Sequence, residues 1–318
     1  MQANREAFKL VMEKPWIWSY IGAAAVWLAA VAFTGGQGAG ELATTTLSFA
    51  VFMVIIAVGQ MFVITTGPGN VDLSLPATIA LTGAVAMKVM DGQNGMILWG
   101  LGASVFTGFA VGLFNYLLIW LLRIPPIIAT MSANFLVMST AIAYGRGLRI
   151  KPPPVFADFT TAQILGVPVL AICTVIFAVV MSIILSRTIY GRSVTAIGQN
   201  MRAAWLAGVR VGRTRMLVYV LSGTFAGLCG ALLAGFSGGS SLNAGEAYLL
   251  ASIAVVVIGG TSVAGGRGNV PGLWGAALFL YLLEAMLNTY GAGAGVRMIM
   301  TGLIIIVVIT IAGGEETG

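Results

Sequence analysis

The chain has 318 residues and a formal net charge of +6, yet only 8% of its residues are charged and 58% are hydrophobic. A soluble domain usually has about 25% charged residues, because water must solvate its surface. The composition therefore excludes a soluble globular protein, and the mean hydropathy of +0.98 indicates a chain surrounded mostly by lipid.

The spanning elements are expected to be helices, because long apolar runs alternate with Gly, Pro and short charged clusters. A membrane barrel would instead show stretches of about ten residues with strictly alternating polarity. A spanning helix needs about 20 mostly apolar residues. The sequence predicts an all-α polytopic membrane protein, a single transmembrane domain over 1–318. Its ten expected spans lie near 17–34, 46–66, 71–89, 95–121, 124–143, 164–186, 216–236, 247–264, 271–289 and 296–313.

The first apolar stretch has two interpretations. It contains the small-x-small triplet Ala30-Val31-Ala32, which is also typical of a signal-peptide cleavage site. The stretch is longer than a usual signal core, and the preceding segment carries Glu6 and Glu13, which favours a retained first helix.

The distribution of basic residues predicts the orientation, because Lys and Arg accumulate on the cytoplasmic side. With the N-terminus inside and ten crossings, eleven Lys and Arg residues fall on the inner side and five on the outer side. Both termini are therefore expected in the cytoplasm. Residues 1–15 would be a cytoplasmic N-terminal segment, 187–215 a cytoplasmic loop and 144–163 a periplasmic loop.

A Gly-x-Gly-Asn-Val pattern occurs twice, as "GPGNV" at 67–71 and "GRGNV" at 266–270. Both copies would lie at an inner turn between a descending and an ascending helix. They indicate either a parallel internal repeat of the kind found in transporters or a chance recurrence of Gly-rich turns.

The segment 190–215, "YGRSVTAIGQNMRAAWLAGVRVGRTR", carries five arginines and no acid. Its centre predicts one short helix, capped by Ser193 or Thr195 and ended by Gly208. The helical spacing would form one apolar face from Ile197, Met201, Ala204, Trp205 and Gly208. The helix either lies on anionic headgroups or is bound by a cytoplasmic protein, with Arg202 and Trp205 as natural anchors.

Three motifs in this order resemble the permease subunits of bacterial ATP-binding-cassette (ABC) sugar importers of the ribose, xylose, arabinose and autoinducer-2 type. They are Asp72-Leu73-Ser74, the Gly-x-Asn-x-x-Ala-Ala-x-x-x-Gly pattern starting at Gly198, and "GGTSVAGGRG" at 259–268. The resemblance covers nearly the whole chain. Met201 departs from the family pattern in the coupling segment, and Ala251 and Leu75-Pro76 depart from it near the expected pathway. The resemblance implies that a soluble binding protein does most of the selection, so only a solute class is expected: small, neutral and hydroxyl-rich, such as a monosaccharide or polyol.

The resemblance implies a permease subunit that forms the translocation path and couples it to a separate ATPase. The expected partners are two ABC ATPase subunits, a periplasmic sugar-binding protein, a second permease copy in a homodimer or close-relative heterodimer, and the bacterial inner membrane. ATP-Mg would bind in the partner subunits, and no nucleic acid is expected. The segment 187–215 would be the coupling element, whose ATPase-coupling residues are Gly198, Asn200, Arg202, Ala203, Ala204, Trp205 and Gly208.

No catalytic or metal site is expected in this chain, which is therefore not predicted to be an enzyme. A phosphate-cradling Walker loop needs a Lys after Gly, and none of the four lysines follows a glycine. The glycines of the third motif are interpreted as a structural turn into a helix at Pro271, with Asn269 as its cap. These turn residues are Gly259, Gly260, Gly265, Gly266 and Gly268.

Polar residues at membrane depth are costly and often functional. Each candidate either lines the solute path or forms structural hydrogen bonds, and for Asp72 the structural alternative is an acid that complements a helix dipole. The path candidates are Asp72, Ser74, Thr130, Ser132, Asn134, Glu284 and Asn288. An ion-coupled secondary transporter, with Glu284 or Asp72 as its ion carrier, is the alternative function, but membrane-embedded acids are few. Gly223 and Gly227 are expected to permit close helix packing.

Overall fold

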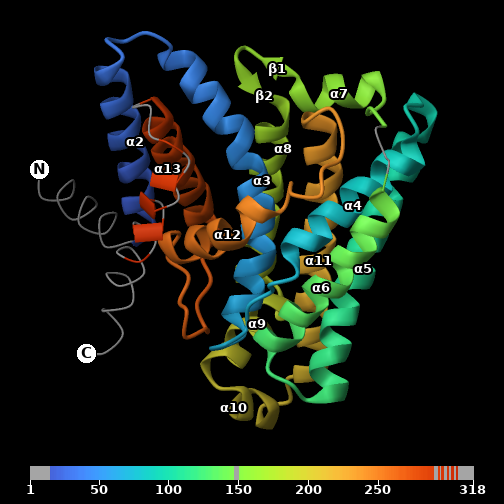
Figure 1. The fold of residues 1–318 in the computed structure, drawn as a ribbon. Helices are drawn as coiled ribbons and strands as arrows, with labels where there is room; N and C mark the ends of the chain where they lie inside the picture. The colour runs from blue at the N-terminus through green and yellow to red at the C-terminus, as the bar shows by residue number, and fades with distance from the viewer. Residues whose placement is uncertain are drawn as a thin grey trace, which may run out of the picture.

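The computed structural model describes residues 15–146 and 150–289, together with 293, 295–296, 299–300, 302–303 and 306. Within these residues the protein is a bundle of helices (Figure 1). The elements are α2 (Pro15–Phe33), α3 (Ala39–Thr65), α4 (Leu75–Met90), η1 (Asn94–Met96), α5 (Ile97–Leu122), α6 (Pro126–Gly145), α7 (Pro154–Thr161), β1 (Gln163–Ile164), β2 (Val167–Pro168), α8 (Val169–Arg187), α9 (Ile189–Gln199), α10 (Met201–Leu206), α11 (Val211–Phe236), α12 (Glu246–Ile258) and α13 (Val270–Thr289).

Among the described residues, seven helices are long and apolar enough to cross a membrane, and α4 and α12 are shorter apolar helices. Together these nine helices correspond to the first nine predicted spans. Most of the tenth predicted span, 296–313, and the N-terminal segment before Pro15 lie outside the described residues.

Three of the predicted spans are shorter as helices, in each case because non-helical residues occupy one end. The span predicted from 164 begins with a β-hairpin, in which β1 pairs antiparallel with β2. Leu165 and Gly166 form its turn with φ of 51° and 80°, the left-handed conformation that two-residue hairpins favour. α8 therefore starts only at Val169.

The spans predicted for 71–89 and 247–264 are also shorter as helices. α4 begins at Leu75 because the preceding residues form an irregular, buried segment. α12 ends at Ile258, and Gly260 after it has a φ of 88°, which ends a helix without steric cost only because glycine has no Cβ.

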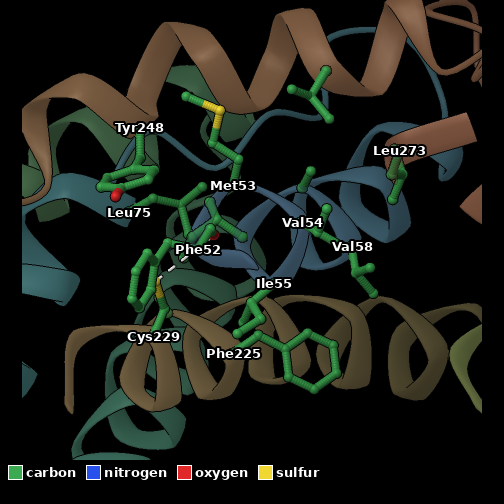
Figure 2. Close-up of a cluster of buried hydrophobic side chains, with 14 of the residues drawn as sticks. Phe52, Met53, Val54, Ile55, Val58, Leu75, Phe225, Cys229, Tyr248 and Leu273 are labelled. Carbon is green, nitrogen blue, oxygen red and sulfur yellow. Dashed lines mark hydrogen bonds between the residues drawn. The ribbon is translucent and has the colours of Figure 1, made fainter. Parts of the chain in front are cut away.

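α3 is the central helix of the bundle, and its side chains from Ala50 to Thr65 are all buried. The sequence of this stretch is apolar on every face, which is typical of a helix surrounded by others. α11 packs on one side of it, and α12 and α13 pack on others. Figure 2 shows this core, where Phe52 and Ile55 of α3 lie against Cys229 and Phe225 of α11.

α5 and α11 pack closely against each other. A Cβ on Gly223 would overlap the Gly108 carbonyl oxygen, and one on Gly227 would lie 2.7 Å from the Ser104 carbonyl oxygen. The Ser104 hydroxyl donates to the Gly227 carbonyl at 2.7 Å across the contact. The packing role predicted for Gly223 and Gly227 is therefore confirmed.

The two ends of the bundle carry different elements (Figure 1). α9, α10 and the turn at 259–269 lie at one end, whereas α7 and the β-hairpin lie at the other. The arginines of the segment 190–215 belong to the first of these ends, on or beside α9 and α10.

Candidate functional site

The segment predicted to be one helix forms two, so that prediction was wrong. Asn200 interrupts it with an extended backbone, φ −160° and ψ 105°. Its Oδ1 accepts a hydrogen bond from the Ala203 N–H at 2.9 Å. An Asn side chain in this position caps the start of a new helix, so α10 begins directly after α9 ends.

Neither Ser193 nor Thr195 caps α9. The Thr188 hydroxyl takes that role and accepts from the Gly191 N–H at 3.1 Å, because the helix starts at Ile189, ahead of both predicted caps. The predicted end at Gly208 is confirmed: Gly208 has a φ of 86°. The N–H groups of Gly208 and Val209 donate to the carbonyls of Trp205 and Ala204, which is the usual glycine stop of a helix.

The single apolar face predicted for this segment does not form, because α9 and α10 point in different directions. Ile197 and Ala204 are buried, whereas Trp205 and Leu206 are 65% and 71% exposed. Arg202 and Ala203 are also exposed. α9 thus attaches the segment to the bundle, and α10 presents an aromatic, aliphatic and basic surface at the end of the molecule.

α9 is held against the bundle by its own side chains. The Tyr190 ring stacks on Phe62 of α3, with the ring centroids 6.0 Å apart. Burial raises the pKa of the Tyr190 hydroxyl, so the phenol stays neutral in this apolar contact.

Gly198 of α9 lies between two segments that are distant in the sequence. A Cβ at Gly198 would overlap the Thr65 carbonyl oxygen and the Gly266 N–H, and would lie 2.9 Å from the Gly266 Cα. The Gly266 N–H itself donates to the Thr65 carbonyl at 2.9 Å. Only a residue without a side chain fits where three backbones meet this closely.

The two Gly-x-Gly-Asn-Val patterns therefore contact each other at the α9 end. A Cβ on Gly265, next to the second pattern, would lie 2.5 Å from the Cα of Gly67 in the first. Both patterns lie at turns of the same end, as expected for the repeat. α9 packs over the place where these two turns meet.

Asn269 directly precedes α13, in the position predicted for a helix cap, and its side chain also closes the turn before the helix. Its Nδ2 donates to the Gly259 carbonyl at 2.9 Å, and its N–H donates to the Thr261 hydroxyl at 3.2 Å. These bonds close the turn at 259–269 upon itself. The predicted structural role of the turn glycines fits this compact turn, in which Gly260, Gly265 and Gly266 all have positive φ.

The first pattern is part of the irregular segment 66–74, which is mostly buried in the bundle except for the exposed turn residues Pro68 and Gly69. Buried backbone groups outside a helix need hydrogen-bond partners from elsewhere. The Asp72 N–H donates to Gln60 Oε1 at 3.2 Å and the Leu73 N–H to the Thr130 hydroxyl at 3.1 Å. Polar side chains of α3 and α6 thus replace the missing helical partners.

Asp72 is fully buried and is the centre of this polar cluster. Its Oδ1 accepts from the Ser74 hydroxyl at 2.7 Å and from Asn115 Nδ2 at 3.3 Å, and its Oδ2 accepts from the Ser222 hydroxyl at 2.8 Å. Hydrogen bonds from several donors are what keep a buried carboxylate tolerable. Asp72 therefore joins the start of α4 to α5 and α11.

Asn70 connects the same segment to the first turns of α11. Its Oδ1 accepts from Arg215 Nη2 at 3.1 Å and from the Tyr219 hydroxyl at 3.3 Å, while its Nδ2 donates to the Gly67 carbonyl at 3.0 Å. α11 directly follows the α9–α10 segment, so Gly198 of α9 and Arg215 of α11 both lie against residues between Thr65 and Asn70, just before Asp72.

The predicted path residues do not form one cluster. Asp72, Ser74, Thr130 and Asn134 meet at the start of α4, where Asn134 Oδ1 accepts from the Ala77 N–H at 3.3 Å. Ser132 is exposed on the outer face of α6. Sequence reasoning missed Gln60, Asn115 and Ser222, since a single polar residue within an apolar helix does not indicate its partner.

Glu284 and Asn288 lie apart from that cluster, on the second half of α13. Glu284 borders a cavity of about 330 Å³ together with Tyr248, Tyr281 and the serines of the connection between α11 and α12. Phe49 also lines it and stacks on Tyr281, with centroids 5.0 Å apart. Apolar and aromatic walls with a few polar groups are typical of small-molecule sites of about 300–1,000 Å³. Asn288 does not line this cavity.

The comparisons with known proteins agree on one family. A family model described as "Branched-chain amino acid transport system / permease component" matches residues 42–309. No solved structure matches the chain significantly.

Several of the similar curated proteins are named as sugar permeases. The ribose import permease protein RbsC of Bacillus subtilis (strain 168) is 34% identical over 259 residues, which cover 80% of this chain and 79% of the relative. RbsC of Escherichia coli (strain K12) is 31% identical over 262 residues, or 81% of each chain. The fructose import permease protein FrcC of Rhizobium meliloti is 30% identical over 277 residues, covering 81% of this chain and 73% of the relative. With this coverage and identity, the chain belongs to the family of permease subunits of bacterial ABC sugar importers, which are membrane transport components and not enzymes.

Proposed function

We propose that this protein forms the membrane path for a small, neutral, hydroxyl-rich solute, a monosaccharide or polyol, and couples that path to a separate ABC ATPase through α9 and α10. The names of the relatives, which import ribose and fructose, support the solute class. The aromatic and polar walls of the cavity beside Glu284 suit the same class, because sugars offer both apolar faces and hydroxyl groups.

The position of Gly198 is the observation that carries the coupling proposal. α9 touches the Thr65 carbonyl and the Gly266 N–H through this residue, with no side chain between them. A displacement of α9 by a bound ATPase cannot be absorbed by side-chain rotation there, so it is passed to both turns. The first turn continues into the buried segment that holds Asp72.

The exposed residues of α10 provide the docking surface in this proposal. Trp and Arg dominate the energetics of protein interfaces, and Trp205 and Arg202 are both exposed on α10. Gly208 and Asn200 act indirectly, since they set the end and the beginning of the helix that presents these side chains.

The remaining features of the proposal follow from the charge and from the family. The end with α9 and α10 lies in the cytoplasm, because the arginines gather there. The chain crosses a bacterial inner membrane about ten times with both termini in the cytoplasm. It pairs with a second permease copy and receives solute from a periplasmic sugar-binding protein. ATP-Mg binds to the two ATPase subunits and not to this chain.

Co-purification with the ATPase subunits tests the docking surface. We expect Trp205→Ala to lower the retained ATPase by roughly tenfold or more, the scale of an interface anchor. Trp99→Ala is the matched control, because Trp99 is 71% exposed in the first turn of α5. That turn follows η1, whose Asn94 accepts from the Val155 N–H of α7 at the opposite end.

Uptake into proteoliposomes then tests the transport activity. The proposal requires uptake of a sugar or polyol that depends on ATP and on a soluble binding protein. Uptake driven by an ion gradient alone, or uptake of a branched-chain amino acid in place of a sugar, would contradict it.

A further inference from the structure

We propose that a cavity near the α9–α10 end binds the anionic headgroup of a phospholipid. This arginine pocket lies between the end of α5, the start of α6 and the start of α11, and has a volume of about 660 Å³. Its lining includes Arg123, Arg215, Tyr116, Trp120 and Gly212. The pocket is separate from the cavity beside Glu284 and from the exposed surface of α10.

The positive charge of the pocket is not neutralised by the residues around it. None of the residues that line it is an acid. The oxygens of Asp72, the described acid nearest to Asn70 in the sequence, already accept from Ser74, Asn115 and Ser222. Two guanidinium groups facing one cavity are therefore left to attract an anion from outside.

Arg215 is held in place by one hydrogen bond and has a further N–H group that is not used by the described residues. One of its terminal nitrogens donates to Asn70 Oδ1 at 3.1 Å, which fixes the guanidinium. Its Nε is buried and has no hydrogen-bond partner among the described residues. A buried donor left unsatisfied is costly, and a phosphate oxygen is the partner that Arg geometry favours, because guanidinium binds phosphate through two parallel hydrogen bonds.

The mouth of the pocket favours a lipid over a soluble anion. Trp120 and Leu121 of α5 are 62% and 68% exposed beside Arg123, on a helix that is apolar and long enough to span a membrane. Trp is enriched where the membrane meets water, and basic pockets between membrane helices bind anionic headgroups. The acyl chains would then lie along the apolar outer side of α5.

A bound headgroup would hold Arg215 in place. Arg215 donates to Asn70, which in turn donates to the Gly67 carbonyl, so the headgroup would also stabilise the segment 66–74. We therefore expect anionic lipid to stabilise the protein. The inference depends on the chain lying in a membrane, but not on the identity of the solute or of the ATPase.

The test compares binding of phosphatidylglycerol and phosphatidylcholine to the full chain purified in detergent. The readouts are bound lipid per chain by native mass spectrometry and the midpoint of thermal unfolding. We expect phosphatidylglycerol to bind preferentially and to raise the midpoint. Arg123→Asn should weaken its binding roughly fivefold, about what one basic residue contributes near an anionic surface. Asn tolerates the left-handed backbone of Arg123, whose φ is 57°, so the fold should persist.

Two further variants make the test specific. Arg123→Lys keeps the charge and should retain most of the binding, whereas the matched control Arg213→Gln removes an exposed arginine of α11 that does not line the pocket and should bind as the wild type does. Equal binding of the two lipids, or an equal loss in Arg213→Gln, would overturn the proposal. Equal stabilisation by inorganic phosphate alone would overturn the lipid assignment and indicate a soluble anion. A failure of ATPase co-purification with normal lipid binding would affect only the proposed coupling.

Discussion

The packing of Gly198 makes a quantitative prediction about Gly198→Ala. A Cβ added there would lie 2.9 Å from the Gly266 Cα and closer still to the Thr65 carbonyl oxygen and the Gly266 N–H. Carbon atoms pack at about 3.5–4.0 Å, so α9 must move by at least roughly half an ångström from the glycine turn. The backbone of Gly198 is helical, so alanine introduces no backbone strain and the effect isolates the contact.

The cost has two parts. Forcing an extra methyl group into a packed site costs about 1–3 kcal/mol. Moving the turn also weakens the hydrogen bond from the Gly266 N–H to the Thr65 carbonyl, which has a net value of about 0.5–1.5 kcal/mol. We therefore expect Gly198→Ala to lower the free energy of unfolding by about 3 kcal/mol.

Chemical denaturation in detergent measures this loss, and uptake into proteoliposomes measures its functional effect. The exposed residues of α10 are unchanged, so the ATPase should still co-purify while solute uptake falls. Gly102→Ala is the matched control, because a Cβ at Gly102 meets no atom within 4 Å. Alanine should be neutral there or stabilising by about 0.5–1 kcal/mol, the usual gain over glycine in a helix. Wild-type stability and uptake in Gly198→Ala would refute the direct contact between α9 and the two turns.

Three further substitutions test other parts of the structure. Ser222→Ala removes the hydroxyl that donates to Asp72 Oδ2 at 2.8 Å and should cost about 1–3 kcal/mol, the penalty for leaving a buried polar atom without its partner; denaturation measures it. Gly112→Val should separate α5 from α11, since a Cβ there overlaps the Tyr219 carbonyl oxygen, and the loss of about 1–3 kcal/mol or more should appear as a lower unfolding midpoint. Glu284→Gln should lower solute uptake, because Glu284 borders the cavity; uptake kinetics measure the effect.

Each of these substitutions has a control in the chain. The Thr224 hydroxyl donates only to the Val220 carbonyl of its own helix, at 2.7 Å, so Thr224→Ala should cost less than Ser222→Ala. Gly102→Val places the same side chain on α5 in open space. Glu246→Gln changes an exposed acid that does not line the cavity. Equal effects in a variant and its control would exclude the specific contact.

The lipid environment, the helical class and the approximate positions of the first nine spans could be predicted from the sequence. These properties depend on local composition, because a run of about 20 apolar residues indicates a membrane-spanning helix whichever other helices it packs against. The order of the three motifs also indicated the family, and the glycine stop at Gly208 was correctly placed. Each of these signals depends only on residues that are close together in the sequence.

Other local predictions were wrong where a side chain forms a hydrogen bond with the backbone in place of a helical hydrogen bond. Asn200 ends one helix and caps the next, although the residues on both sides favour helix. The apolar spacing around Ile197 and Trp205 indicated one shared face, but the break at Asn200 turns one of these residues inward and the other outward. An apolar face can be predicted from periodic spacing only if the helix is unbroken. A polar side chain that accepts from the backbone can break the helix, and the spacing then no longer defines one face.

Only the tertiary structure brings together the groups that define the candidate site. Ser222 lies 150 residues after Asp72 in the sequence, and Gly198 lies between turns from opposite halves of the chain. The sequence marked Asp72 and Gly198 as notable, but not as a buried hydrogen-bond centre and a backbone junction. Hydropathy records whether a residue avoids water, whereas its partner is decided by which helices meet and how closely glycine lets their backbones approach.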